Sequence, residues 1–357
     1  MKSFYINPRL DKESELFFYN EKIEIFSQYR NKLKVTKEFI DKCRDKWDNA
    51  KKQTNDYEYI YTSTNPSKNI CAKIPISRSY FKLREILYDL NIFIDDKVAC
   101  IAEAPGGFIQ CLLDMTDHNK IYGITLLSDN KDVPYWNNSL LSHKRVYLSN
   151  GDDNTGDLYN PKNLLHFLNE AEKNSCSLVT ADGGFDYSDD FNSQEYLSYK
   201  LIFSEVFLAL SLLKKNGTFI CKIFDIFTIH TVNILYLLYT SFEEIILIKP
   251  VTSRLTNSEK YVVCKGFKGY DKDKSNLLFC LILNENIYDF TLDIPQSFID
   301  ELSRYNEKFI NSQISMIQKS IYCARSRNVS YTANYKQVKK GKEWCRKYGL
   351  PINEIYI

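Results

Sequence analysis

Histidine and glycine are scarce in this chain, which has four histidines and 12 glycines among 357 residues. The ten cysteines stand singly, without a Cys-x-x-Cys pair, so the close ligand pairs of a structural zinc site are missing and we predict no metal. No stretch approaches the roughly 18 apolar residues of a membrane span, and polar residues follow Met1 where a signal peptide would be apolar. These absences predict a soluble intracellular protein with reduced, mostly buried thiols and no membrane partner.

An excess of charge of one sign is also missing, because 47 basic residues face 45 acidic ones and the formal net charge is +2. A near-neutral sum excludes no class of partner, since a nucleic-acid binder can be neutral overall and basic on one face. With 44% hydrophobic and 26% charged residues, the composition is that of a folded globular protein.

Short apolar runs alternate with helical patterns in the middle of the chain. Candidate strands are residues 98–104, 120–127, 145–150, 177–184, 217–225, 244–250 and 260–267. The longest helical pattern, at 193–217, is expected to end in lysines before Gly217. Apolar strands alternating with helices favour an α/β fold with a mostly parallel, doubly wound sheet. The short connection between the last two strands predicts that they form an antiparallel pair.

Charged helical sequence flanks this core on both sides, at residues 11–55 and from residue 270 onward. We therefore predict three parts: a helical N-terminal extension at 1–69, a core at 70–270, and a mainly helical, basic C-terminal extension at 271–357.

A glycine turn joins the first candidate strand of the core to a helix. Its residues are Glu103, Ala104, Pro105, Gly106, Gly107 and Phe108. Glycine permits positive φ and close approach of a ligand, and a helix N-terminus has unpaired amides. Ligands of doubly wound sheets bind outside the carboxyl ends of the strands, so we expect this turn to line a cofactor crevice. The spacing is neither a dinucleotide fingerprint nor a P-loop, and a tight turn without a ligand is the alternative.

Four charged residues stand out: one at the exit of a candidate strand, one inside the next strand, one on a helix expected before the first strand, and one just ahead of the last strand. They are Lys82 in SRSYFKLREIL, Asp182 in VTADGG, Lys222 in FICKIFD and Glu259 in TNSEKYVVC. A charged lysine in an apolar strand is costly to bury. Lys222 is therefore either a strand-end lysine that reaches water, or a base whose pKa is lowered.

Together these four residues resemble the Lys-Asp-Lys-Glu tetrad of the FtsJ-like family of S-adenosylmethionine-dependent RNA 2′-O-methyltransferases. The segments EAPGGF, GDDNTGDL (151–158) and KPVTSRLTNSEKYVVC (249–264) look closest to the branch that methylates mRNA caps. Within that branch they most resemble the enzymes that act on the second transcribed nucleotide. The resemblance covers residues 70–270, with a weaker echo in GKEWCRKYGLP (341–351).

The resemblance implies a Rossmann-like methyltransferase fold and transfer of a methyl group to a ribose 2′-hydroxyl near the mRNA 5′ cap. It implies the tetrad as the catalytic residues, with Lys222 as the base. Burial and Lys82 would lower the pKa of Lys222, whereas Asp182 and Glu259 would raise it, and the sequence leaves the sum open. No metal is needed, because no phosphate is displaced and no water is activated.

The cofactor implied by the resemblance is S-adenosylmethionine. Its expected contacts are the glycine turn, Thr125, either Asp152 or Asp153, and Asp182. Many relatives carry an acidic residue at the place of Cys100, and some carry one at the place of Thr125. Glu103 is expected to replace the first.

A basic segment near the C-terminus, from Arg325 to Lys347, has eight basic residues against one acidic residue, with aromatics between them. Phosphate pairing with base stacking suits single-stranded RNA, which predicts RNA binding by Lys339, Lys340, Lys342 and Arg346. The alternative is a solvated basic helix that packs on the core through its aromatics.

The expected partners are capped mRNA or another RNA, and other capping or transcription machinery. Two alternatives stay open: 2′-O-methylation of ribosomal or transfer RNA without dependence on a cap, and a catalytically silent RNA-binding subunit with the same fold. The intact tetrad argues against the second. The composition suits an intracellular parasite or a large cytoplasmic virus, so we expect the cytoplasm, or the host cytoplasm or virion of a virus. Oligomeric state is not predicted.

Overall fold

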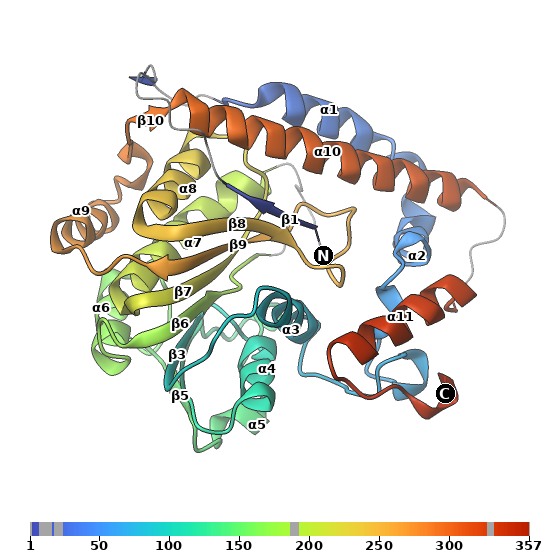
Figure 1. The fold of residues 1–357 in the computed structure, drawn as a ribbon, viewed down its shortest axis with the longest axis horizontal. Coiled ribbons are helices and arrows are strands. Elements are labelled where there is room, and N and C mark those ends of the chain that lie inside the picture. Colours follow the sequence, from blue (N-terminus) through green and yellow to red (C-terminus); the bar gives the residue numbers. More distant parts are fainter. Residues whose placement is uncertain (1, 7–15, 18–23, 186–192, 327–331, 357) are drawn as a thin grey trace.

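The computed structural model describes residues 2–6, 16–17, 24–185, 193–326 and 332–356. An eight-stranded sheet lies at the centre, in the order β1-β8-β9-β7-β6-β3-β4-β5 (Figure 1). The strands are β1 (Lys2–Tyr5), β3 (Lys97–Ile101), β4 (Lys120–Ile124), β5 (Val146–Ser149), β6 (Cys176–Ala181), β7 (Leu213–Ile223), β8 (Phe242–Lys249) and β9 (Lys260–Phe267). All seven strands expected from the apolar runs are present.

The strand directions also agree with the prediction. Strands β5, β4, β3, β6 and β7 run parallel to one another. Strand β9 is antiparallel to β8 and lies between β7 and β8, where it is antiparallel to both. The amino end of β9 therefore lies at the same edge of the sheet as the carboxyl ends of β6 and β7.

Helices cover both faces of the sheet, as a doubly wound fold requires. One face carries α3 (Ser79–Asp89), α4 (Gly107–Met115) and α5 (Asn138–Leu141), and the other carries α6 (Pro161–Glu170), α7 (Gln194–Leu212) and α8 (Ile229–Ser241). Alternate residues of β3 enter the two apolar cores, with Val98 and Cys100 on one face and Ala99 and Ile101 on the other. Burial on both faces explains why the strands read as continuous apolar runs.

The two ends of the chain pack against each other. The N-terminal segment forms β2 (Leu16–Phe17), α1 (Ser27–Glu38), η1 (Asp41–Cys43), α2 (Arg44–Thr54), η2 (Glu58–Ile60) and η3 (Pro66–Lys68). The C-terminal segment forms α9 (Lys272–Leu283), η4 (Ile287–Asp289), β10 (Ile294–Pro295), α10 (Gln296–Arg325), α11 (Tyr335–Lys347) and η5 (Glu354–Tyr356). The long helix α10 runs beside α1 and contacts α2 (Figure 1).

Strands in the N-terminal segment were not predicted. Residues 2–5 add β1 to the edge of the sheet against β8, and β2 pairs with β10. Part of the helical prediction for 11–55, at residues 11–15 and 18–23, lies outside the described residues. The three-part division of the chain stays a prediction. No helix in the described part of the chain is long and apolar enough to cross a bilayer.

The end of α7 differs from the prediction. The helix ends at Leu212, before the lysines, because Leu213 already pairs with Cys176 in the sheet and is fully buried there. Lys214, Lys215 and Gly217 therefore belong to β7, at a point where the register with β6 shifts.

Candidate functional site

Four charged side chains meet where β6 and β7 end and β9 begins. They are Asp182 after β6, Lys222 near the end of β7, Glu259 before β9 and Lys82 on α3. The ammonium nitrogen Nζ of Lys222 lies 3.3 Å from Oδ1 of Asp182. The Nζ of Lys82 lies 2.8 Å from the carboxylate of Glu259. The structure thus brings together the four residues that the sequence singled out, as two ion pairs.

Lys222 is held mainly by Asp182. Its Nζ also donates to the main-chain oxygen of Asp182 at 2.6 Å, while the Tyr261 hydroxyl donates to Oδ1 of Asp182 at 2.9 Å. Burial lowers the pKa of Lys222, but the carboxylates of Asp182, Glu259 and Glu205 outweigh burial, and the net pKa is raised. The sum that the sequence left open therefore favours an ammonium group at neutral pH.

Glu259 is an ionised carboxylate despite its burial. Burial raises the pKa of Glu259, but the ammonium groups of Lys82, Lys222 and Lys249 lower it well below its ordinary value. The Ser253 hydroxyl also donates to this carboxylate at 2.8 Å. Glu259 therefore fixes Lys82 through a charge-assisted hydrogen bond.

Glu205, a residue that the sequence analysis did not single out, lies beneath the site on α7. It is 1% exposed, and its Oε2 accepts a hydrogen bond from Sγ of Cys221 at 3.5 Å. Burial raises the pKa of Glu205 to about 8, although Lys222 opposes this. Glu205 is therefore largely neutral at neutral pH and gains charge in mildly alkaline solution.

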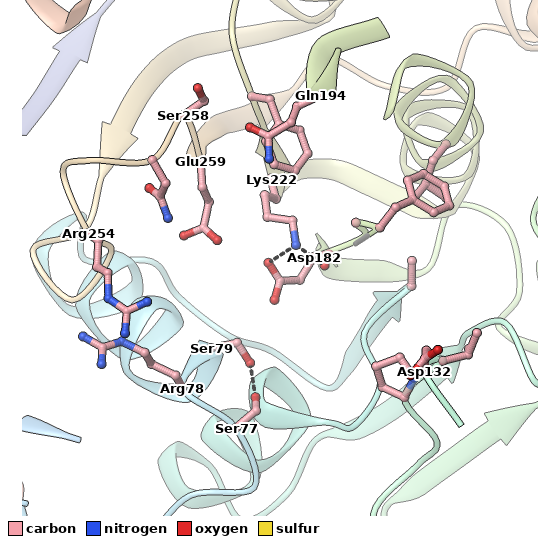
Figure 2. Close-up of a pocket in the computed structure, with 18 of the residues that line it drawn as sticks. Ser77, Arg78, Ser79, Asp132, Asp182, Gln194, Lys222, Arg254, Ser258 and Glu259 are labelled. Carbon is pink, nitrogen blue, oxygen red and sulfur yellow. Dashed lines mark hydrogen bonds and ion pairs between the residues drawn. The ribbon is translucent and has the colours of Figure 1, made fainter. Parts of the chain in front are cut away.

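A pocket of about 1260 Å³ opens at the same edge of the sheet, and Asp182, Lys222 and Glu259 are among its lining residues. It lies outside the carboxyl ends of β3, β4, β6 and β7, where ligands of doubly wound sheets bind. In the view of Figure 2, Arg78 and Arg254 lie on one side of Asp182, and Asp132 lies on the other.

The two sides of this pocket differ in charge. The side that we call the acidic half is lined by Thr125, Leu126, Asn130, Asp132, Val133, Pro134, Asp157, Leu158 and Tyr159, and none of these described residues is basic. Figure 2 shows Arg78 and Arg254 opposite Asp132. We call these two arginines, together with the basic lining residues of α1 and α2, the basic half: Lys34, Lys37, Arg44, Lys51, Arg78 and Arg254. Two acids, Glu38 and Asp41, lie among them. The acidic half suits a cationic ligand and the basic half suits an anionic one.

A buried carboxylate holds the two arginines of the basic half. Glu58, on η2, is fully buried and accepts hydrogen bonds from Nε and Nη2 of Arg254 at 2.9 and 2.6 Å. Nη1 of Arg78 lies 3.4 Å from the same carboxylate. Burial raises the pKa of Glu58, but hydrogen bonding from Arg254 and the charges of both arginines lower it to about 2. One negative charge thus fixes two guanidinium groups side by side.

The glycine turn meets the pocket through Ala104 and Pro105. A Cβ on Gly106, whose φ is +109°, would lie 2.1 Å from Cδ1 of Leu140, and a Cβ on Gly107 would meet Ser77 and Ser79. The glycines therefore allow close packing of the helices, and cofactor binding by this turn stays a prediction.

Glu103 caps helix α4 rather than facing the pocket. Its carboxylate accepts hydrogen bonds from the amides of Phe108 at 2.5 Å and Ile109 at 3.3 Å, and its side chain is buried. Amides that the sequence suggested for a ligand are therefore satisfied within the protein.

Thr125 lines the pocket, but Asp152 and Asp153 do not. The Asp153 carboxylate organises its own loop, accepting hydrogen bonds from side chains of Thr155, Asn160 and Asn163. The acid that reaches the pocket from the segment GDDNTGDL is Asp157. Cofactor binding by this loop stays a prediction, and Asp157 is the residue of the loop whose carboxylate lines the pocket.

The four residues expected to bind RNA lie on α11, away from the pocket lining: Lys339, Lys340, Lys342 and Arg346. Lys340 forms an ion pair with Asp56 at 2.5 Å. Trp344 is buried, with its ring 5.5 Å from that of Phe81. Trp344 therefore packs α11 on the core, and RNA binding by the four basic residues stays a prediction.

Four of the six residues of the basic half lie in residues 27–54, which the sequence predicted only as helices outside the core. The other two could have been found from their positions in the sequence. Arg78 stands one helical turn before Lys82, and Arg254 stands in the segment KPVTSR that carries the family resemblance. The described residues contain no group of three or more histidines, cysteines, aspartates or glutamates that could hold a metal ion.

Comparison with known proteins gives the following likenesses. The family model of the FtsJ-like methyltransferases matches residues 75–267. Cap-specific mRNA (nucleoside-2′-O-)-methyltransferase 1 of Ailuropoda melanoleuca is 32% identical over 322 residues, which cover 85% of this chain and 37% of that protein. The Homo sapiens protein of the same name is 34% identical over 272 residues, covering 71% of this chain and 32% of that protein.

This chain therefore spans about a third of the length of these curated relatives. Their shared name ends in 1, so the second-nucleotide branch of the resemblance gains no support from them and stays a prediction. A solved ribosomal RNA methyltransferase from Plasmodium falciparum is 22% identical, covers 54% of this chain and 99% of that chain, and has a TM-score of 0.41, too low to carry an argument.

Proposed function

The chain belongs to the FtsJ-like methyltransferase family, and from this premise we propose that it transfers a methyl group from S-adenosylmethionine to a ribose 2′-hydroxyl near the 5′ cap of mRNA. The observation that carries the proposal is the charge division of the pocket, with Asp182 and Lys222 between its acidic and basic halves. The names of the relatives support the capped substrate.

The acidic half fits the cofactor. Carboxylates of Asp132 and Asp157 stand beside the apolar side chains of Leu126, Val133 and Leu158, which suits a cationic molecule with a flat apolar ring. S-adenosylmethionine would supply an electrophilic methyl group on a sulfonium, whose positive charge also disfavours the ammonium form of Lys222.

The basic half fits the RNA. Arg78 and Arg254 are fixed by Glu58, and lysines of α1 and α2 line the pocket with them. Fixed guanidinium groups bind phosphate oxygens through paired hydrogen bonds. An RNA strand bound here would have its ribose beside the four charged residues of the tetrad.

Lys222 accepts the proton of the 2′-hydroxyl as the new carbon–oxygen bond forms, which requires that Lys222 first lose its own proton. Asp182 orients the amine through the 3.3 Å ion pair. Glu259 holds Lys82, whose ammonium donates to the ribose oxygen and keeps it in line with the methyl group.

The test is methyl transfer from isotope-labelled cofactor to two RNAs of one sequence, with and without a 5′ cap, followed by digestion and mapping of the modified nucleotide. We expect label on a ribose 2′-oxygen of the capped RNA, and none with the Lys222→Met variant. Equal labelling of the uncapped RNA would support a ribosomal or transfer RNA substrate instead. Binding of RNA without transfer would support the silent subunit.

A further inference from the structure

One wall of the pocket is held from behind by a row of side chains. The wall is residues 256–259, which all line the pocket and which we call the 256–259 wall. Gln313 of α10 donates to the main-chain oxygen of Thr256 at 3.2 Å, and the Ser258 hydroxyl donates to Asp225 at 2.8 Å. The remaining two residues, Asn257 and Glu259, are bound by one side chain.

That side chain is Lys249, at the end of β8, which is 3% exposed. Its Nζ donates to the main-chain oxygen of Asn257 at 2.9 Å, to the Asn257 side-chain oxygen at 2.7 Å, and to the main-chain oxygen of Glu259. An ammonium group has three N–H donors, so each meets one acceptor. Burial, with Lys260 and Lys82, lowers the pKa of Lys249 well below its ordinary value. Glu259 opposes this shift, as do the three acceptors, because a neutral amine has only two donors for them.

An aromatic ring from the C-terminal extension covers this ammonium. The ring centroid of Phe309, on α10, lies 5.5 Å from Nζ of Lys249 and 4.4 Å from Nζ of Lys260. Lys260 is also buried, and its Nζ lies 3.7 Å from Oδ1 of Asp225. The face of an aromatic ring attracts a cation, most strongly where water is excluded. The Phe309 ring of α10 thus lies over both buried amines, although burial lowers the pKa of Lys249 well below its ordinary value and that of Lys260 to about 8.

We propose that Lys249 is a positioning residue for methyl transfer, which fixes the 256–259 wall and is itself held by Phe309. The proposal rests on the proposed function, because its effect on rate passes through Glu259. A shift in the main chain of Glu259 would move the carboxylate that fixes Lys82. Helix α10 then belongs to the framework of the active site although it lies far from it in the sequence.

The first test is Lys249→Met, which keeps the length of the side chain and removes its donors. We expect kcat to fall about a hundredfold, the cost typical of misplacing a reacting group by about 1 Å. We expect the affinity for S-adenosylmethionine to stay unchanged, because the residues proposed to bind the cofactor are those of the acidic half. Lys308→Met, at an exposed lysine of α10, is the matched control and keeps wild-type kcat.

The second test separates the aromatic ring from simple packing. Phe309→Tyr keeps a ring face over the ammonium and retains kcat, whereas Phe309→Leu fills the space without a ring and lowers kcat. Equal kcat values for the two variants would overturn the role of Phe309, and this pair carries the test if Lys249→Met does not fold.

Amide hydrogen exchange of residues 256–260 tests the positioning without any activity. Faster exchange there in Lys249→Met, with exchange elsewhere unchanged, supports the proposal. It does so even if the wild-type chain transfers no methyl group, because a lack of transfer would refute only the proposed function. Unchanged exchange, or a wild-type kcat in folded Lys249→Met, overturns the proposal.

Discussion

The protonation of Lys222 sets a pH dependence that can be worked out from the site. Burial lowers the pKa of Lys222, but the carboxylates around it outweigh burial and leave the pKa above its ordinary value of 10.5. If Lys222 is the base, the rate of methyl transfer follows the fraction of Lys222 that has lost its proton. That fraction rises with pH as long as the pH stays below the pKa.

The magnitude follows directly. At about pH 7.5, an amine with a pKa near 10.5 is deprotonated in roughly one molecule in a thousand, and a raised pKa makes the fraction smaller. Between about pH 6.5 and 9.5 the rate should therefore rise without a plateau, by about tenfold per pH unit over the part of this range below about pH 7.5. Glu205, with a pKa of about 8, gains charge inside this range and keeps Lys222 protonated, so the rise should be shallower above about pH 8.

Single-turnover methyl transfer with saturating cofactor and RNA measures this rate directly. Lys222→Arg should lower the rate by at least about a hundredfold and remove its pH dependence, because a guanidinium does not lose its proton. Lys215→Arg, at an exposed lysine of the same strand, is the control and should keep the wild-type profile. Glu205→Gln removes the charge gained near pH 8 and should restore the full slope above it.

Two results would refute this reasoning. A wild-type rate that is flat between about pH 6.5 and 8 would mean that no group with a raised pKa loses a proton before transfer. A folded Lys222→Arg protein with near wild-type turnover would show that Lys222 does not act as a base.

Three further predictions concern stability and RNA affinity. Glu58 has a pKa of about 2 against an ordinary 4.5, so its stabilisation is present above pH 4.5 and is lost as the pH falls toward 2. Between pH 4.5 and 2, the free energy of unfolding measured with denaturant should fall by about 3 kcal/mol more in the wild type than in Glu58→Gln. An equal fall in the two proteins would contradict this prediction. Gly106→Ala combines positive φ with a collision and should lower the free energy of unfolding by at least about 2 kcal/mol, more than Gly269→Ala, where φ is positive and the space is open. Equal losses would mean that the collision is relieved. If α11 binds RNA, neutralising Lys339 and Lys342 should reduce the salt slope of RNA affinity by about 0.7 per lost contact, whereas an unchanged slope would leave α11 a solvated helix.

Two of the four clustered charged residues could be predicted from the sequence alone, because they stand at the ends of expected strands. Asp182 and Lys222 follow apolar runs that could only be buried strands, and parallel strands end at one edge of a sheet. Lys82 and Glu259 came from the family resemblance. The direction of the pKa shift of Lys222 could not be predicted, because it is the balance of burial against the carboxylates of Asp182, Glu259 and Glu205, and only the packed structure gives their distances.

The two halves of the pocket were less accessible to sequence reasoning. The basic half depends on α1 and α2 folding back toward the sheet edge, and no local pattern predicts this contact. The Glu103 carboxylate accepts hydrogen bonds from amides that a ligand could otherwise use. The sequence does not show this contact, because it depends on the conformation of the turn. Strand β1 is too short, at four residues, to give a pattern of its own.

The central claim is that the acceptor is a ribose 2′-hydroxyl near the cap. The most direct test is a set of capped RNAs of one sequence, each with 2′-deoxyribose at one of the first few transcribed nucleotides. The account predicts that transfer of labelled methyl is lost for the RNA that lacks the accepting hydroxyl and is retained for the others. Undiminished transfer to every member of the set would contradict it, because the methyl group would then go to another atom or to a nucleotide outside the cap region.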